Sequence, residues 1–93
     1  MHKITFSKRA ENDLDILSKG DPKSYKKCFD LIRSTMIDPR NGIGKPEQLK
    51  HGNTDEYEAW SRRVNDKDRM IYMIYSMEDW VQVMSFKGHY DDK

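Results

Sequence analysis

The spacing of the apolar residues changes once along this chain, and this change constrains the fold more than any other feature. Between residues 10 and 36, apolar side chains recur every three to four positions, as on one face of a helix. Between residues 57 and 87, they alternate with polar side chains, as in strands with one buried face. This order predicts an α+β fold, with two N-terminal helices packed on one face of a small antiparallel sheet.

Two helices are predicted, with a short break between them. Ser7 can accept hydrogen bonds from free backbone amides and cap the first helix, which Gly20 ends. Asp21 can cap the second helix, with Pro22 at its first position, and Pro39 ends it. The apolar stripe of this second helix is predicted to face the core, and it consists of Tyr25, Cys28, Phe29, Ile32 and Met36.

The remaining segments are predicted as strands joined by polar turns. They span residues 3–6, 48–50, 57–64, 69–75 and 80–87. One face of the sheet must cover the helices, so the other face is free to carry a basic surface. The candidates for this surface are Arg63, Arg69, Lys87 and His89. The alternative is that these are ordinary solvated residues, since charged side chains are common on an open sheet face.

Composition argues against several classes of protein. A length of 93 residues predicts a single domain spanning residues 1–93. No apolar run approaches the roughly 20 residues of a membrane span, and the N-terminus lacks the apolar core of a signal peptide. The single cysteine, Cys28, cannot form an internal disulfide, so we expect a cytoplasmic protein.

The same counts argue against a metal site and against a strongly basic nucleic-acid-binding domain. One cysteine and three scattered histidines do not provide a zinc-binding cluster, and no other cofactor is expected. The formal net charge is only +1, so any RNA-binding surface must arise from segregation of charge between faces.

Four segments resemble those of the YoeB/Txe toxins, in the same order and with similar spacing. They read GKPEQLKH at residues 44–51, WSRRV at 60–64, DRMIY at 68–72 and KGHY at 87–90. The corresponding family segments read GKPEPLK, WSRRI, HRLVY and R-x-HY. The resemblance covers essentially the whole chain. It departs at Gln48, which replaces a proline, at Lys87, which replaces an arginine, and at residues 91–93, which continue past the tyrosine.

The resemblance implies a RelE-like microbial-ribonuclease fold and a toxin of a type II toxin–antitoxin system. It implies ribosome-dependent cleavage of mRNA in the A site, which inhibits translation. The implied partners are a YefM-type antitoxin, the ribosome and mRNA, with a homodimer or a toxin–antitoxin heterocomplex, operator DNA bound only through the antitoxin, and no membrane. By position, Glu47, Arg69, His89 and Tyr90 match the active-site residues of the family. Lys50 and Arg63 match its supporting basic residues, which bind RNA.

These residue types suit metal-independent RNA cleavage. That reaction needs a base for the 2′-OH, positive charge at the phosphate and an acid for the 5′-oxygen. Its products are a 2′,3′-cyclic phosphate, or a 3′-phosphate after opening, and a 5′-OH. Glu47 is the predicted base and His89 the predicted acid, although the sequence allows these two roles to be exchanged. Arg69 is predicted to bind the phosphate, and Tyr90 to stack on a base or bind the phosphate.

Each assignment has a structural alternative. Glu47 can pair with a neighbouring lysine, Arg69 with Asp66 or Asp68, and His89 or Tyr90 can pack on the sheet. Further cations that could contact RNA are Lys45, Arg62 and Lys87. The alternative function is a non-catalytic module that blocks translation by occupying the ribosome or binds only its antitoxin. A co-repressor within an antitoxin–DNA complex is a weaker alternative, because the net charge argues against direct DNA binding.

Overall fold

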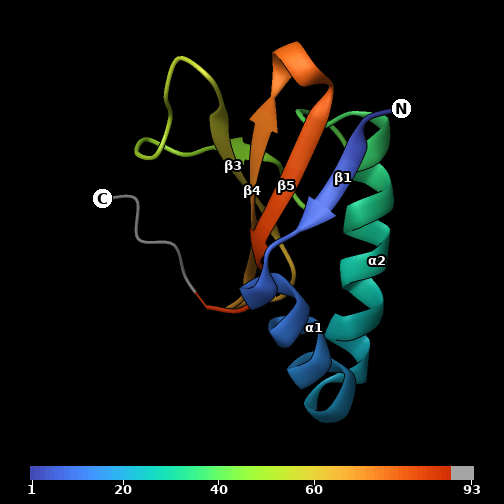
Figure 1. The fold of residues 1–93 in the computed structure, drawn as a ribbon. Helices are drawn as coiled ribbons and strands as arrows, with labels where there is room; N and C mark the ends of the chain where they lie inside the picture. Colours follow the sequence, from blue (N-terminus) through green and yellow to red (C-terminus); the bar gives the residue numbers. More distant parts are fainter. Residues whose placement is uncertain (89–93) are drawn as a thin grey trace.

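One five-stranded sheet with two helices on one face makes up the fold (Figure 1). The structure, a computed structural model, describes residues 1–88. Its elements are β1 (Lys3–Phe6), α1 (Lys8–Gly20), α2 (Pro22–Ile37), β2 (Glu47–Gln48), β3 (Glu58–Arg63), β4 (Arg69–Tyr75), the 3-10 turn η1 (Ser76–Glu78) and β5 (Trp80–Ser85). The predicted α+β class, with two N-terminal helices packed on a small sheet, is confirmed.

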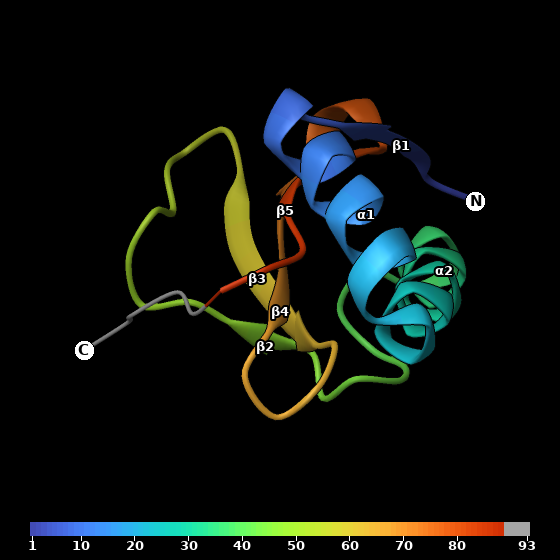
Figure 2. The ribbon, with the colours of Figure 1, turned by 90° about the horizontal axis from the view of Figure 1, so that it is seen from below.

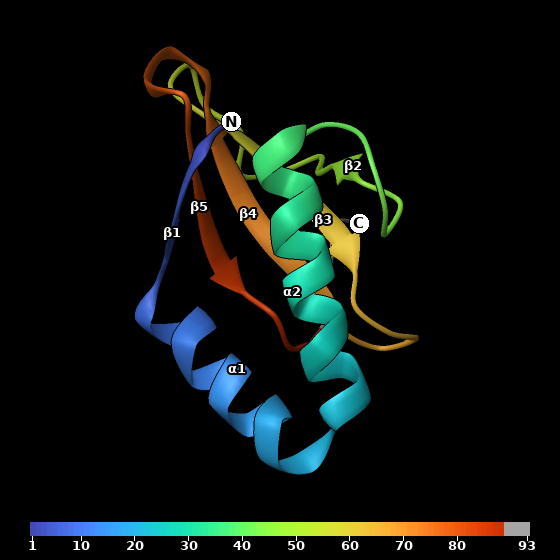
Figure 3. The ribbon, with the colours of Figure 1, turned by 90° about the vertical axis from the view of Figure 1, so that its right-hand side faces the viewer.

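The sheet is mixed, because its first strand runs parallel to its last. The strand order is β1-β5-β4-β3-β2. The three other pairings are antiparallel, as the alternating segments predict, whereas β1 pairs with β5 in the same direction. Figure 3 shows α2 lying along the face of the sheet, with α1 between β1 and α2.

The helix termini follow the local chemistry that the sequence indicates. Ser7 Oγ accepts a hydrogen bond from the Ala10 amide at 3.1 Å, and it donates to the Met84 carbonyl at 2.7 Å. Asp21 Oδ1 accepts from the Ser24 amide at 3.2 Å at the start of α2, where Pro22 occupies the first turn. The Ser7 cap therefore also attaches α1 to the end of β5.

The main core lies between the helices and the sheet. Cys28 is fully buried in it, and burial raises the pKa of its thiol to about 12, as expected for an inert thiol. The prediction that Phe29 faces the core is wrong, since its side chain is 43% exposed. The buried face of α2 is rotated relative to the predicted stripe, and it consists of Ser24, Cys28, Leu31 and Thr35.

A second, smaller apolar cluster lies on the opposite face of the sheet. Its buried members are Leu49, Ala59 and Ile71, with Met73 and Met84 packed against them. Leu49 reaches this face because its amide donates to the Ala59 carbonyl at 2.8 Å, which folds the segment after β2 onto β3. We call the face that carries this cluster the open face, because neither helix covers it (Figure 2).

Candidate active site

Strand register brings three of the predicted site residues to the open face. Glu47 lies opposite Ser61, and Arg63 lies opposite Arg69. Residues two apart in a strand share a face, so these four side chains share the face that also carries Ile71. Glu47 and Arg63 are diagonal cross-strand neighbours, a relationship that separates Cα atoms by roughly 7–8 Å.

The loop before Glu47 is held in place by the buried guanidinium of Arg62. The Arg62 Nη2 atom donates to the carbonyls of Asp38 and Asn41 at 2.7 and 2.9 Å. Its Nη1 atom donates to the Ile43 carbonyl at 3.0 Å and to Ser34 Oγ at 2.8 Å. Arg62 is 0% exposed, so the suggestion that it contacts RNA is wrong. It instead fixes the path of residues 38–43 toward β2.

A glycine completes the approach of this loop to the sheet. The Gly44 carbonyl accepts from the Arg63 amide at 2.7 Å, and Gly44 has a φ of +82°. A Cβ atom at this position would lie 2.6 Å from Leu31 Cδ2, so the close approach requires glycine. This backbone contact holds Gly44, which lies three residues before Glu47, next to the strand that carries Arg63.

Within residues 1–88, the two arginines of the open face form no ion pair, even with the neighbouring Glu47 carboxylate. No ion pair within residues 1–88 involves Glu47, Arg63 or Arg69. The alternative pairing of Arg69 with Asp68 is not formed. Asp68 instead accepts from the Gly88 amide at 2.8 Å. Glu47 and Arg63 are exposed and Arg69 is half-buried, so all three remain accessible to a ligand.

A hollow of about 350 Å³ lies on the same face, next to β4 and β5. Its lining combines apolar side chains with two cations, and it consists of Ser7, Arg9, Ile71, Met73, Met84, Ser85, Lys87 and Gly88. Such a volume is at the lower end of those that hold small ligands. Apolar side chains together with two cations suit a ligand that carries both an apolar surface and a negative charge.

The remaining predicted site residues are distributed differently. Lys50 is exposed in the segment that follows β2. Lys87 lies at the hollow, where its Nζ atom is 4.0 Å from Asp68 Oδ2. His89 and Tyr90 lie outside the described residues, so their roles and positions remain predictions.

Sequence reasoning missed three buried polar residues near this region. Ser61 is 0% exposed beside Glu47, and its hydroxyl has no hydrogen-bond partner among residues 1–88. Asp13 and Asp68 are also buried, at 7% and 3% exposure. Asp13 could have been identified from the sequence, because it falls within the apolar face of α1, where burying a charge is costly. Nothing in the local sequence distinguishes Ser61.

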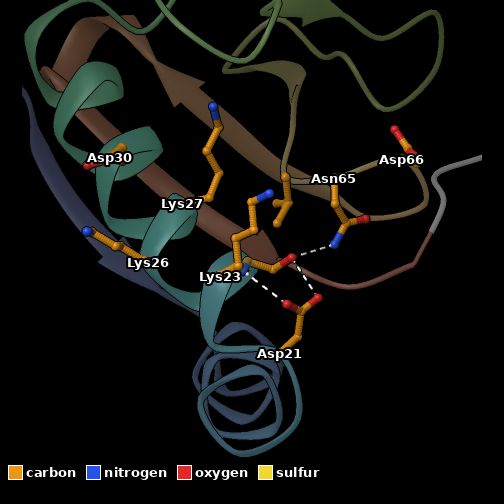
Figure 4. Close-up of a pocket in the computed structure, with 9 residues that line it drawn as sticks. Asp21, Lys23, Lys26, Lys27, Asp30, Asn65 and Asp66 are labelled. Atoms are coloured by element: carbon orange, nitrogen blue, oxygen red, sulfur yellow. Dashed lines mark hydrogen bonds between the residues drawn. The ribbon is translucent and has the colours of Figure 1, made fainter.

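A second hollow, of about 620 Å³, lies on the helix side between the start of α2 and the turn after β3. Figure 4 shows Asp21 beside Asn65 there, linked through hydrogen bonds to Ser24. Its charged lining residues are Lys23, Lys26, Lys27, Asp21, Asp30 and Asp66. These charges balance, and none of the predicted site residues lies here, so the open face is the stronger candidate.

The described part of the chain contains neither a candidate metal-binding cluster nor a candidate membrane-spanning helix. Within residues 1–88, no three histidine, cysteine, aspartate or glutamate side chains are grouped so that they could hold a metal ion. No helix in this range has the length and apolar character that crossing a bilayer requires.

Known proteins resemble this chain over nearly its full length. A family model described as the YoeB-like toxin of bacterial type II toxin–antitoxin systems matches residues 6–90. Toxin YoeB of Synechocystis sp. is 36% identical over 88 residues, covering 95% of this chain and 96% of the relative. The YoeB dimer from Staphylococcus aureus superposes with a TM-score of 0.79 at 36% identity, covering 96% and 98% of the two chains. The heterotetrameric YoeB–YefM complex of that organism superposes with a TM-score of 0.75 at 35% identity, covering 97% and 99%.

Proposed function

Because this chain belongs to the YoeB-like toxins of bacterial type II toxin–antitoxin systems, we propose that it is an endoribonuclease that cleaves mRNA in the ribosomal A site. The observation that carries this proposal is the grouping of Glu47, Arg63 and Arg69 on one face of the sheet, without ion pairs among the described residues. A carboxylate beside two uncompensated guanidinium groups suits proton transfer next to a phosphate.

In the proposed reaction, the RNA supplies its own nucleophile. Glu47 accepts the proton of the 2′-OH, and the 2′-oxygen forms a bond to the adjacent phosphorus. The bond from phosphorus to the 5′-oxygen breaks, and His89 donates a proton to that oxygen. The products are a 2′,3′-cyclic phosphate, which opens to a 3′-phosphate, and a 5′-OH. No metal or other cofactor enters these steps.

Positive charge at the phosphate is the second requirement. Arg69 and Arg63 each present paired N–H donors, which match the non-bridging oxygens of a phosphate. Their stabilisation is greatest when negative charge accumulates on those oxygens in the transition state. Lys50 contributes a further contact to the RNA backbone, and Tyr90 stacks on a base or binds the phosphate.

The proposed partners follow from the family. Staphylococcus aureus YoeB is known as a dimer and in a complex with YefM. We expect this chain to bind a YefM-type antitoxin, to form a homodimer or a toxin–antitoxin heterocomplex, and to meet operator DNA only through the antitoxin. Its target is mRNA on the ribosome, which places the protein in the cytoplasm.

The test is to map the ends that the protein creates in a defined mRNA. Purified toxin is mixed with end-labelled mRNA, with and without programmed ribosomes. The proposal expects a new 5′-OH end within the A-site codon, and only with ribosomes. Arrested translation with intact mRNA would instead support blocking by occupancy, and would remove the catalytic roles of Glu47 and His89.

Single substitutions test the assigned roles. Glu47→Ala and His89→Ala should each lower the cleavage rate by at least about a hundredfold, as for a lost acid or base. Both should retain the thermal midpoint and antitoxin binding of the unmodified chain. Glu78→Ala is the matched control, because Glu78 is exposed in η1 at the other end of β4 and should leave cleavage unchanged. Normal cleavage by either test variant would remove the role assigned to that residue.

A further inference from the structure

The chain leaves β5 through three residues whose backbone amides all donate to buried carboxylates. Asp13 Oδ2, on α1, accepts from the amides of Phe86 and Lys87 at 3.0 and 3.2 Å. Asp68 Oδ1, in the turn between β3 and β4, accepts from the Gly88 amide at 2.8 Å. Two elements that are remote in sequence thus hold one short segment, residues 86–88, immediately before His89.

Each carboxylate also has a further partner besides these amides. Burial alone would raise the pKa of Asp68, but hydrogen bonds from Gly88 and Asn65 and the charge of Lys87 hold that pKa below its ordinary value. Asn65 Nδ2 lies 3.1 Å from Asp68 Oδ2. Asp13 Oδ2 lies 3.9 Å from Nε of Arg9, a residue that lines the hollow of the open face.

This arrangement is a costly way to satisfy three amides. Burying a charge is unfavourable, and hydrogen bonds and partner charges recover only part of that cost. Phe86 is 0% exposed, so its amide needs an acceptor within the protein, whereas the amide of the exposed Gly88 could bind water instead. Unlike a water molecule, the two carboxylates fix each amide relative to α1 and to the β3–β4 turn. Gly88 adopts a φ of +89°, so the fixed segment also turns sharply at its end.

We infer that Asp13 and Asp68 are positioning residues for His89 and Tyr90. By fixing the amides of residues 86–88, they hold in place the segment that directly precedes His89, the proposed acid, and Tyr90, the proposed RNA contact. This inference rests on the proposed function, since it concerns the geometry of that same reaction. A displacement of about 1 Å in a reacting group can reduce a rate a hundredfold, so such anchoring has a large effect on catalysis.

The kinetic test separates positioning from binding. Asp13→Ala and Asp68→Ala remove the acceptors, and both should lower kcat for cleavage of ribosome-bound mRNA by at least about tenfold. The KM for programmed ribosomes should stay within about twofold, because Arg63 and Arg69, which are proposed to bind the phosphate, lie on β3 and β4 and stay in place. Asp66→Ala is the matched control, because Asp66 is exposed in the same turn and accepts no hydrogen bond from residues 86–88.

Conservative variants distinguish a loss of positioning from a loss of folding. Asp68→Asn keeps the side-chain volume and one acceptor oxygen for the Gly88 amide, and Asp13→Asn keeps one for Phe86 and Lys87. Both should retain the fold and recover most of the kcat lost in the alanine variants. Alanine and asparagine variants with equal losses of kcat and equal thermal midpoints would overturn the inference, because the acceptor oxygen would then be irrelevant.

Amide hydrogen exchange supplies a readout that does not depend on cleavage. In Asp68→Ala the Gly88 amide should exchange at least about tenfold faster, with the amides of β3 and β4 unchanged. Faster exchange with normal kcat would overturn the inference, and so would a loss of kcat with normal exchange. If the unmodified toxin cuts no RNA, the proposed function fails. If it cuts RNA and the alanine variants cut equally well, only the positioning role fails.

Discussion

Arg63 and Arg69 are direct cross-strand partners, so two guanidinium groups occupy opposed positions on β3 and β4. Like charges at opposed positions destabilise an antiparallel pair. No ion pair within residues 1–88 offsets either charge. A pair that weakens the sheet but concentrates positive charge beside Glu47 is consistent with a surface that binds a phosphate.

The first prediction is that Arg63→Gln stabilises the protein and impairs its activity. Removing one of two opposed charges should raise the free energy of unfolding by about 0.2–1 kcal/mol. Cleavage of ribosome-bound mRNA should fall by at least about tenfold, because a phosphate loses a charged donor. Urea unfolding at low salt and a cleavage assay measure the two effects. Arg33→Gln is the control, since Arg33 is exposed on α2 and pairs with Asp30. A less stable or fully active Arg63→Gln would contradict the prediction.

The sequence predicted the features that local chemistry determines. The caps at Ser7 and Asp21, the break at Gly20 and the long strands all depend on residues that are neighbours in the chain. The parallel pairing of β1 with β5 could not be read in this way, because an alternating segment does not specify its partner strand. The open-face position of Arg63 and Arg69 followed from alternation, and it needed only the register between their strands.

Arg62 shows why some of the buried polar residues could not be identified from the sequence. Strand alternation puts Arg62 on the same face as Trp60 and Val64, but its charge favoured the prediction that it contacts RNA. It is buried because the loop after α2 supplies backbone carbonyls that accept its donors, an arrangement that exists only in the folded chain. Asp68 is a similar case, since its partner amide at Gly88 is 20 residues away.

The second prediction concerns that network. Arg62→Met should lower the free energy of unfolding, by about 1–3 kcal/mol for each buried acceptor left without a donor, because the carbonyls of the loop and the Tyr72 hydroxyl lose their donor inside the protein. Arg62→Lys should recover little, since an ammonium group cannot reproduce the planar set of donors. Chemical denaturation measures both variants. A loss below about 1 kcal/mol in Arg62→Met would show that water replaces the guanidinium without difficulty.

The third prediction compares two glycines. Gly44→Ala should lower the free energy of unfolding by about 1–3 kcal/mol, because Gly44 has a positive φ and a Cβ atom would clash with Leu31. Gly20→Ala should be neutral or stabilising by up to about 1 kcal/mol, because no atom lies within 4 Å of a Cβ atom at the end of α1. Thermal unfolding of both variants checks this contrast. Equal effects at the two positions would contradict it.

The fourth prediction concerns pH. Arg40 donates to Glu58 at 3.2 and 3.0 Å, and these bonds, with one from Trp60, hold the pKa of Glu58 below its ordinary value despite partial burial. A lowered pKa in the folded state stabilises the protein above the unfolded-state pKa, and this contribution is lost as pH falls through the folded-state pKa. Glu58→Gln should therefore lower the free energy of unfolding by about 0.2–1 kcal/mol at neutral pH, since the pair is about one-third exposed.

The difference in the free energy of unfolding between Glu58→Gln and the unmodified chain should shrink as the solution is acidified, whereas Glu78→Gln should show little difference at any pH. Urea unfolding at a series of pH values measures this, and a deficit in Glu58→Gln that persists in strong acid would show that the ion pair is not its source.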